Sequence, residues 1–162
     1  MVGSDAGMLK TLDWVVVGAG LLAYISSFFH WYTASVSVLN ITRSAGATAW
    51  NAGFGAWFSV LLLVVAGGLA LVSRVGGRLR LPVSTPLITL GLSTLAFVTI
   101  LLRWVTFPDA TDGLGEQDTF ELGGAFTASS GAGPGLYLGL TAAIAAVVAS
   151  FLTFRAAGSN VN

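Results

Sequence analysis

The chain has 162 residues, of which 55% are hydrophobic and 9% are charged, and its seven basic and seven acidic side chains give a formal net charge of zero. A soluble domain carries roughly 25% charged residues, so this chain has too few charges to cover a water-exposed surface. The composition and the mean hydropathy of +0.85 indicate a protein whose solvent is lipid. Zero net charge gives no indication of a nucleic-acid partner, and the absence of cysteine excludes disulfides and thiolate metal sites.

Four stretches are long and apolar enough to cross a bilayer, whose hydrocarbon core of about 30 Å needs about 20 helical residues. The spans are predicted at residues 13–32, 50–73, 85–107 and 134–154. The N-terminal MVGSDAGMLKTLD has no pattern typical of a cleaved signal peptide, so the first stretch is interpreted as a retained membrane helix. The predicted fold is an all-α membrane protein in which residues 1–162 form a single four-helix bundle.

The basic residues predict the orientation of these spans. They gather between the second and third spans and at the two ends of the chain: Arg74, Arg78, Arg80, Lys10 and Arg155. Because basic residues mark the cytoplasmic side, both termini are expected in the cytoplasm and the chain in the plasma (inner) membrane. The connections 33–49 and 108–133 are then expected on the outer side.

These two outer connections have the texture of strands. Residues 34–42, ASVSVLNIT, alternate small or polar with apolar side chains, and residues 119–129, TFELGGAFTAS, are rich in threonine and phenylalanine. The pattern favours a small β-cap outside the membrane. The segment RSAGAT, residues 43–48, is expected to form a turn after the first strand.

Aromatic residues flank the predicted spans. Tryptophan and tyrosine collect at headgroup depth because their rings are apolar while their N–H or O–H groups need water. Seven residues are therefore predicted at the membrane–water interfaces: Trp14, His30, Trp31, Tyr32, Trp50, Arg103 and Trp104.

Two of these seven residues have competing interpretations. His30, in FFHWY, is the single histidine, and a metal site needs several ligands, so a hydrogen-bonded interfacial residue is favoured over a metal ligand or a proton carrier. Arg103, in ILLRWVTFP, could reach a lipid phosphate, pair with an acid of the following connection, or belong to a binding site.

A row of small residues leads into the fourth span and continues along it. Its members are Gly131, Gly135, Gly139, Ala142 and Ala146. Because lipid removes the hydrophobic drive for helix association, small residues that let backbones approach closely take its place. This Gly/Ala face predicts a close helix–helix contact, either within the chain or with a second membrane protein.

Four segments resemble a group of small four-span membrane proteins from actinobacteria. The group shares a WY pair ending the first span, a tryptophan-bearing segment before the second, an arginine late in the third and a glycine-rich start of the fourth. Here these are FFHWY, TAWNAGFGAW, LLRWVTFP and GAGPGLYLGL. The layout is also similar to claudin-like tetraspans, although their paired cysteines are absent. The resemblance implies a fold rather than a chemistry.

The functional prediction is a non-catalytic accessory or scaffold subunit of a plasma-membrane complex. Hydrolysis or group transfer needs a base beside a nucleophile or metal, and the sequence offers no such set, so no enzyme activity, cofactor or metal is predicted. The expected partners are the lipid bilayer and another membrane protein or a second copy. The alternative is an oligomeric channel or transporter subunit whose pore is lined by Ser26, Ser27, Ser59, Ser93, Thr94 and Thr99.

Overall fold

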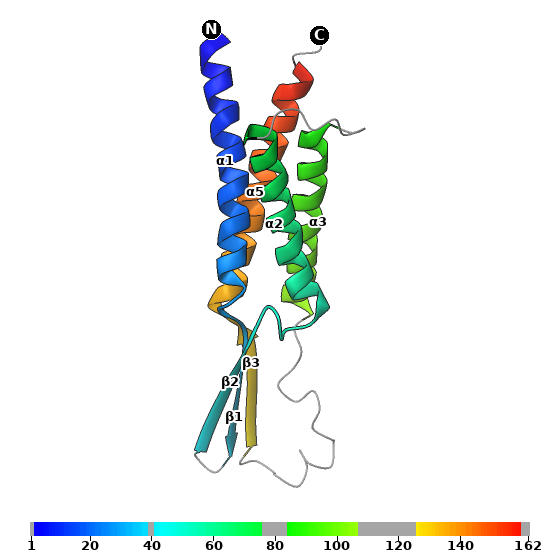
Figure 1. Ribbon diagram of the computed structural model, residues 1–162. Helices are drawn as coiled ribbons and strands as arrows, with labels where there is room; N and C mark the ends of the chain where they lie inside the picture. The colour runs from blue at the N-terminus through cyan, green and yellow to red at the C-terminus, as the bar shows by residue number, and fades with distance from the viewer. Residues whose placement is uncertain (1, 39–40, 76–83, 107–125, 160–162) are drawn as a thin grey trace.

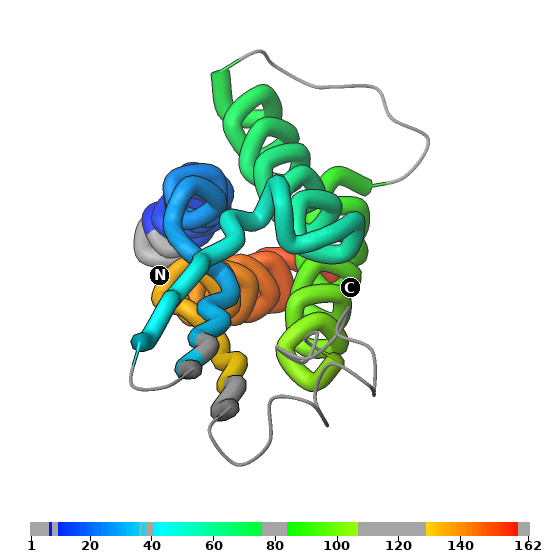
Figure 2. The backbone as a smooth tube through the Cα atoms, turned by 90° about the horizontal axis from the view of Figure 1, so that it is seen from below, coloured from blue at the N-terminus to red at the C-terminus, as the bar shows by residue number. Residues whose placement is uncertain are grey.

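The computed structural model describes residues 2–38, 41–75, 84–106 and 126–159, and these residues form four helices and a small sheet (Figure 1). The helices are α1 (Val2–Ser26), α2 (Phe54–Val75), α3 (Thr85–Val105) and α5 (Pro134–Ser159). They pack in a ring in the order α1, α2, α3, α5, and sequential neighbours run antiparallel (Figure 2). The start of α1 and the end of α5 therefore lie together at one end of the bundle, here called the terminal end.

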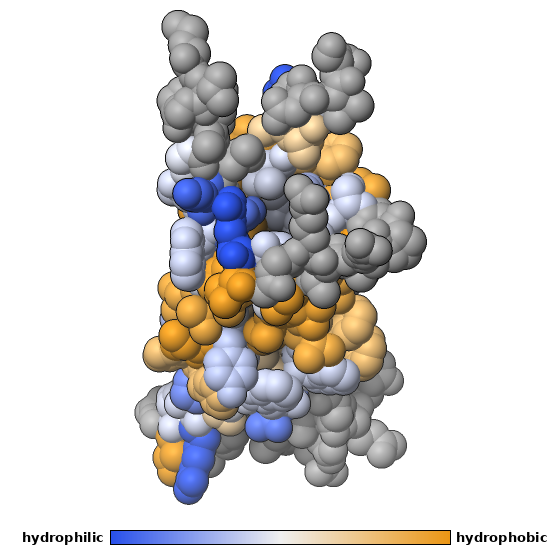
Figure 3. Space-filling model, turned by 45° about the horizontal axis from the view of Figure 1, so that its top comes forward, coloured by the Kyte–Doolittle hydropathy of each residue, from blue (hydrophilic) through white to orange (hydrophobic). Residues whose placement is uncertain are grey.

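The bundle has small residues inside and large apolar residues outside. Its interior is dominated by alanines, with a few larger side chains such as Leu63 and Ile100 that are almost fully buried. The outward side chains include Leu21, Leu61 and Leu102, each about half exposed. Figure 3 shows an apolar band across the middle of one face, with hydrophilic side chains gathered above and below it. Small residues inside and large apolar residues outside are typical of helices packed in lipid.

Three of the four helices in the described part of the chain are long and apolar enough to cross a membrane: α2, α3 and α5. They match the second to fourth predicted spans closely, and Pro86 and Pro134 lie at the starts of α3 and α5 as the sequence indicates. A proline costs little there because the first helical N–H groups have no partner within the helix. The fold is consistent with a multi-pass membrane protein.

An antiparallel three-stranded sheet extends beyond the other end of the bundle, here called the sheet end (Figure 1). Its strands are β1 (His30–Val38), β2 (Ile41–Thr48) and β3 (Phe126–Ala132), with β1 in the centre. The predicted β-cap is therefore present, and it uses segments of both connections. Of the second connection, residues 108–125 lie outside the described residues, and β3 follows them.

Two boundaries differ from the prediction. Helix α1 ends at Ser26 rather than continuing to residue 32, and His30 to Tyr32 begin the central strand. Residues 43–48, expected as a turn, form most of β2. Both differences have one cause: Tyr32 to Val38 pair with β2 on one side and β3 on the other, and these ladders satisfy the backbone of an aromatic and β-branched segment.

Candidate interaction site at the junction of bundle and sheet

Trp31 joins the sheet to the bundle. A β-bulge between His30 and Tyr32 shifts the register of β1, so that the Trp31 side chain lies inside the core cluster, with none of its surface exposed. Its indole N–H donates to the carbonyl oxygen of Ser26 at 3.0 Å, which satisfies the one polar group of the ring. The backbone of β1 is held as well, because the N–H of Gly133 donates to the Trp31 carbonyl at 2.7 Å.

Two glycines of α5 make the space for the Trp31 ring. A Cβ on Gly135 would lie 2.6 Å from Cδ1 of Trp31 and 2.8 Å from the Ser26 carbonyl oxygen. A Cβ on Gly139 would lie 3.0 Å from Cζ2 of the same ring. Only a residue without a side chain allows α5, the end of α1 and the indole to approach this closely.

Arg103 of α3 connects the third helix to the same place. Its Nε and Nη2 donate to the carbonyl oxygen of Ala52 at 3.1 and 2.5 Å, and its Nη1 donates to the carbonyl of Thr106 at 3.2 Å. Ala52 lies in the turn between β2 and α2, and Gly53 follows it with a φ of +96°. That backbone conformation strains any residue with a side chain, so Gly53 gives the turn the shape in which Ala52 meets the guanidinium.

Tyr32 completes the contact with Arg103. Its ring lies under the guanidinium, with 5.3 Å between the ring centroid and Cζ, and its hydroxyl donates to the Arg103 carbonyl at 3.2 Å. Burial raises the pKa of the Tyr32 phenol, while the positive charge and hydrogen bonding of Arg103 oppose part of that rise. The phenol therefore stays neutral at physiological pH.

Ser27 ties β2 to the end of α1. Its carbonyl accepts the N–H of Ala49 at 3.2 Å, and its hydroxyl accepts the indole N–H of Trp50 at 3.2 Å. The Trp50 ring itself is 49% exposed, so this tryptophan combines an apolar face outside with a satisfied N–H. This is the arrangement expected of an interfacial tryptophan.

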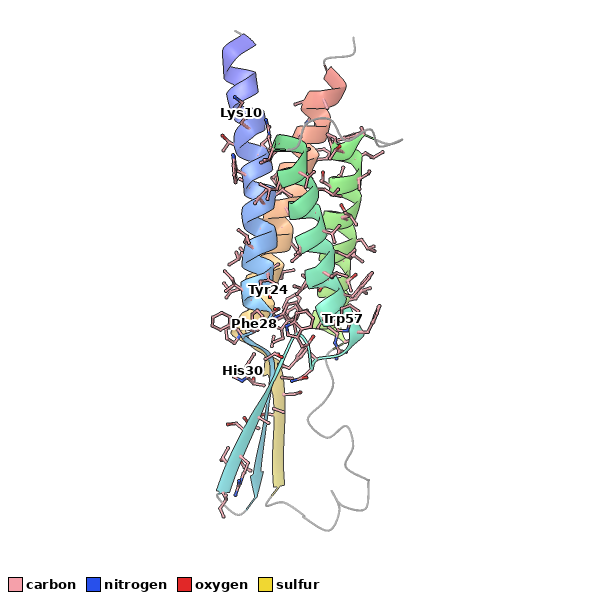
Figure 4. The ribbon with its side chains drawn as sticks, viewed as in Figure 1. Lys10, Tyr24, Phe28, His30 and Trp57 are labelled. Atoms are coloured by element: carbon pink, nitrogen blue, oxygen red, sulfur yellow. The ribbon has the colours of Figure 1, made fainter. Side chains whose placement is uncertain are left out.

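The structure separates the seven residues that the sequence assigns to the membrane interfaces. Trp31 and Tyr32 are buried and do not face lipid, which differs from the prediction. Arg103 donates to backbone carbonyls, and the acids of the connection that follows it lie outside the described residues. Trp14 and Trp104 are exposed, at 59% and 38%. His30 lies at the root of the sheet, where its imidazole sits over Gly46 of β2 (Figure 4). Among the described residues, no group of three or more acidic or histidine side chains could hold a metal ion.

The predicted Gly/Ala face is used within the chain. Gly135 and Gly139 contact Trp31, and Ala142 and Ala146 are each 1% exposed in the core of the bundle. Gly131 belongs to β3 instead, and a Cβ there would meet only the Thr33 hydroxyl, at 4.0 Å. Of the two alternatives left by the sequence, these contacts match packing inside one chain.

Four short segments singled out in the sequence all contribute to this junction. FFHWY supplies Trp31 and Tyr32, TAWNAGFGAW supplies the Ala52–Gly53 turn, LLRWVTFP supplies Arg103, and GAGPGLYLGL supplies the glycines. Sequence reasoning missed Ala52 and considered Ser26 and Ser27 only as lining of a pore. Ser26 and Ala52 accept these hydrogen bonds through backbone carbonyls, a group that the residue type does not reveal. No protein-family model matches the sequence, and no similar curated protein was found.

Proposed function

We propose that the chain is a non-catalytic accessory or scaffold subunit of a plasma-membrane complex, crossing the membrane four times with both termini in the cytoplasm. The observation that carries the proposal is the rigid attachment of the sheet to the bundle. Trp31, Tyr32 and Arg103 fix an extramembrane platform of three strands to three helices at once. A platform held this firmly suits the presentation of a surface to a partner on the outer side.

The side chains of α1 support its role as the fourth span. Ala19, Gly20 and Ala23 face the bundle, whereas Leu21 and Ile25 are more than half exposed. A Cβ on Gly20 would lie 2.8 Å from the Leu63 carbonyl oxygen, so α1 and α2 touch through their backbones. α2, α3 and α5 also have small residues toward the bundle and large apolar residues outside, and this arrangement suits a helix surrounded by lipid.

The pore alternative receives less support from the hydroxyl groups that would line it. Ser26, Ser59 and Thr99 each donate to a carbonyl of their own helix, at 2.8, 2.7 and 2.7 Å. A hydroxyl occupied in this way offers little to a passing ion.

Native purification from the source membrane, followed by mass spectrometry, tests the scaffold role. We expect a second membrane protein in fixed stoichiometry. Ile41, an apolar side chain of β2 that is 67% exposed, is a probe for the contact surface. Ile41→Asp should release the partner, while Ser44→Asp, which puts the same charge on the opposite face of β2, should retain it. Recovery of the chain alone as a monomer would contradict the proposal.

Topology can be tested separately because the chain has no cysteine. A single Ser44→Cys in β2 should react with a membrane-impermeant thiol reagent added to intact cells. A single Gly7→Cys near the start of α1 should react only after the membrane is opened. Equal labelling of both positions in intact cells would exclude the proposed orientation.

A further inference from the structure

The terminal end of the bundle has an open cavity of about 240 Å³, lined by polar and apolar side chains. All four helices line it, and its polar residues include Asp13 of α1, Arg74 of α2, Thr89 of α3 and Ser150 of α5. Such a space can hold a small polar group together with water. It lies at the opposite end of the bundle from the junction, so none of the contacts described above accounts for it.

The hydroxyl groups around the cavity present mainly hydrogen-bond acceptors. Ser73, Thr89 and Thr153 each donate their own proton to a backbone carbonyl of the same helix: Ser73 to Ala70 at 2.8 Å, Thr89 to Pro86 at 3.0 Å, and Thr153 to Ala149 at 2.9 Å. A hydroxyl whose proton is used in this way retains lone pairs that can only accept. A ligand that suits these groups must therefore bring hydrogen-bond donors.

Ser150 is a second, independent observation that points to a ligand at this cavity. The residue is 1% exposed, lines the cavity, and its Oγ has no hydrogen-bond partner among the described residues. A buried hydroxyl without a partner is costly, and such groups are rare in folded proteins. The geometry leaves Ser150 available to whatever occupies the space.

Charge at the mouth of the cavity is balanced. Arg74 donates from Nε to Oδ2 of Asp13 at 2.6 Å, and its Nη2 lies 2.5 Å from the same oxygen. Among the described residues, Oδ1 of Asp13 and Nη1 of Arg74 have no partner. One carboxylate and one guanidinium, each with an unused atom, favour a ligand that carries both charges and no net charge.

The helix ends beside the cavity also bring partial charges of both signs. Ser73 and Arg74 are in the last turn of α2, whose partial negative charge favours a cation. Thr85 and Pro86 are in the first turn of α3, whose partial positive charge favours an anion. A zwitterion can satisfy both ends at once.

We propose that this cavity binds a primary-ammonium zwitterion of the phosphoethanolamine type, either as a phospholipid headgroup or as the free molecule. The ammonium group supplies three N–H donors to Asp13, Ser150 and the acceptor hydroxyls. The phosphate binds toward Arg74 and the first turn of α3. The inference does not depend on the scaffold role, because the site lies within one chain.

Native mass spectrometry of the delipidated full-length chain provides the test. The probes are phosphatidylethanolamine, phosphatidylcholine, whose quaternary ammonium has no N–H donor, and phosphatidylglycerol, which has no ammonium. We expect phosphatidylethanolamine to bind about tenfold more tightly than either control, since it alone forms charge-assisted hydrogen bonds through an ammonium. Equal binding of phosphatidylethanolamine and phosphatidylcholine, or binding of none of the three together with no binding of free phosphoethanolamine, would overturn the proposal.

Variants locate the binding in the cavity. Asp13→Asn should remove the preference for phosphatidylethanolamine, and Ser150→Ala should weaken its binding about fivefold. Ser93→Ala is the matched control, because Ser93 is also a buried hydroxyl without a partner among the described residues but does not line the cavity. Equal losses for Ser93→Ala and Ser150→Ala would refute the assignment.

Competition with free phosphoethanolamine distinguishes the two sources of the ligand. Displacement of the lipid by the free molecule would show that the headgroup alone is recognised. Binding of the lipid without displacement would show that the acyl chains contribute and that the ligand is a membrane lipid. Either result supports the assigned chemistry, and the lipid comparison on the unaltered chain remains decisive if a variant fails to fold.

Discussion

At the sheet end of the bundle, Trp31, Tyr32 and Arg103 all have partners for their polar groups, whereas at the terminal end Ser150 lines an open cavity and its hydroxyl has no partner among the described residues. The same four helices thus end in the packed junction around Trp31 at the sheet end and in the cavity lined by Ser150 at the terminal end. Filled polar sites rigidify a fold, while a buried hydroxyl that lacks a partner and lines a cavity is available to a ligand. The difference indicates that one end of the molecule holds its shape and the other receives a ligand.

Trp31→Ala should have the largest effect on the filled end. Removing a fully buried tryptophan leaves a cavity and takes one of two hydrogen bonds from the Ser26 carbonyl, so we expect the free energy of unfolding to fall by about 3–5 kcal/mol. Chemical unfolding in detergent, followed by circular dichroism, measures the loss. Trp14→Ala, at a ring that is 59% exposed, should cost far less. Similar losses in the two variants would mean that Trp31 does not anchor the sheet.

Gly135→Ala should be the next most severe change. The added methyl group would meet the Trp31 ring at 2.6 Å and two backbone oxygens within 3.0 Å, so we expect a loss of about 1–3 kcal/mol from overpacking. Gly131→Ala adds the same methyl where the nearest atom is 4.0 Å away. The same unfolding measurement should find the second variant close to the unaltered chain, and a reversed order would refute the packing at the junction.

Serine substitutions compare the two ends directly. Ser26→Ala at the filled end removes a hydroxyl that donates to the Ala23 carbonyl at 2.8 Å, so we expect a loss of about 1 kcal/mol. Ser150→Ala, measured without lipid, removes a buried hydroxyl that has no partner in the described part of the chain and should leave stability unchanged or raise it by up to about 1 kcal/mol. A larger loss of stability for Ser150→Ala than for Ser26→Ala would contradict the proposed difference between the two ends.

The smallest expected effect is a dependence on alkaline pH. Burial raises the pKa of the Tyr32 phenol above its ordinary value, so the folded chain holds this proton more tightly than the unfolded chain does. The contribution of Tyr32 is complete below about pH 10 and is lost as the pH rises through the raised pKa. Unfolding curves above pH 10 should therefore show a steeper loss of stability for the unaltered chain than for Tyr32→Phe.

Much of the helical fold could be predicted from the sequence because bilayer thickness sets the length of an apolar span. The ranges 50–73, 85–107 and 134–154 fall close to α2, α3 and α5 for that reason. The end of α1 could not be predicted in this way. The segment FFHWY suits a helix end at the membrane surface as well as a strand, and its pairing with β3, far along the chain, decides between them.

The junction shows what sequence patterns leave out. The spacing of Gly135 and Gly139 predicted a close approach, and the approach exists, but an indole from a strand approaches rather than a second helix. Arg103 stood out as a charge near the membrane, yet its partner is the carbonyl of Ala52, a group that every residue has. Residue types indicate where contacts are needed, while the backbone geometry determines which groups meet.

The sheet has short connections to two helices. Three residues separate α1 from β1, and Gly133 alone separates β3 from α5. With so few linking residues, neither β1 nor β3 can turn independently of the helix it is joined to, so the direction in which the sheet projects is set by the ends of α1 and α5.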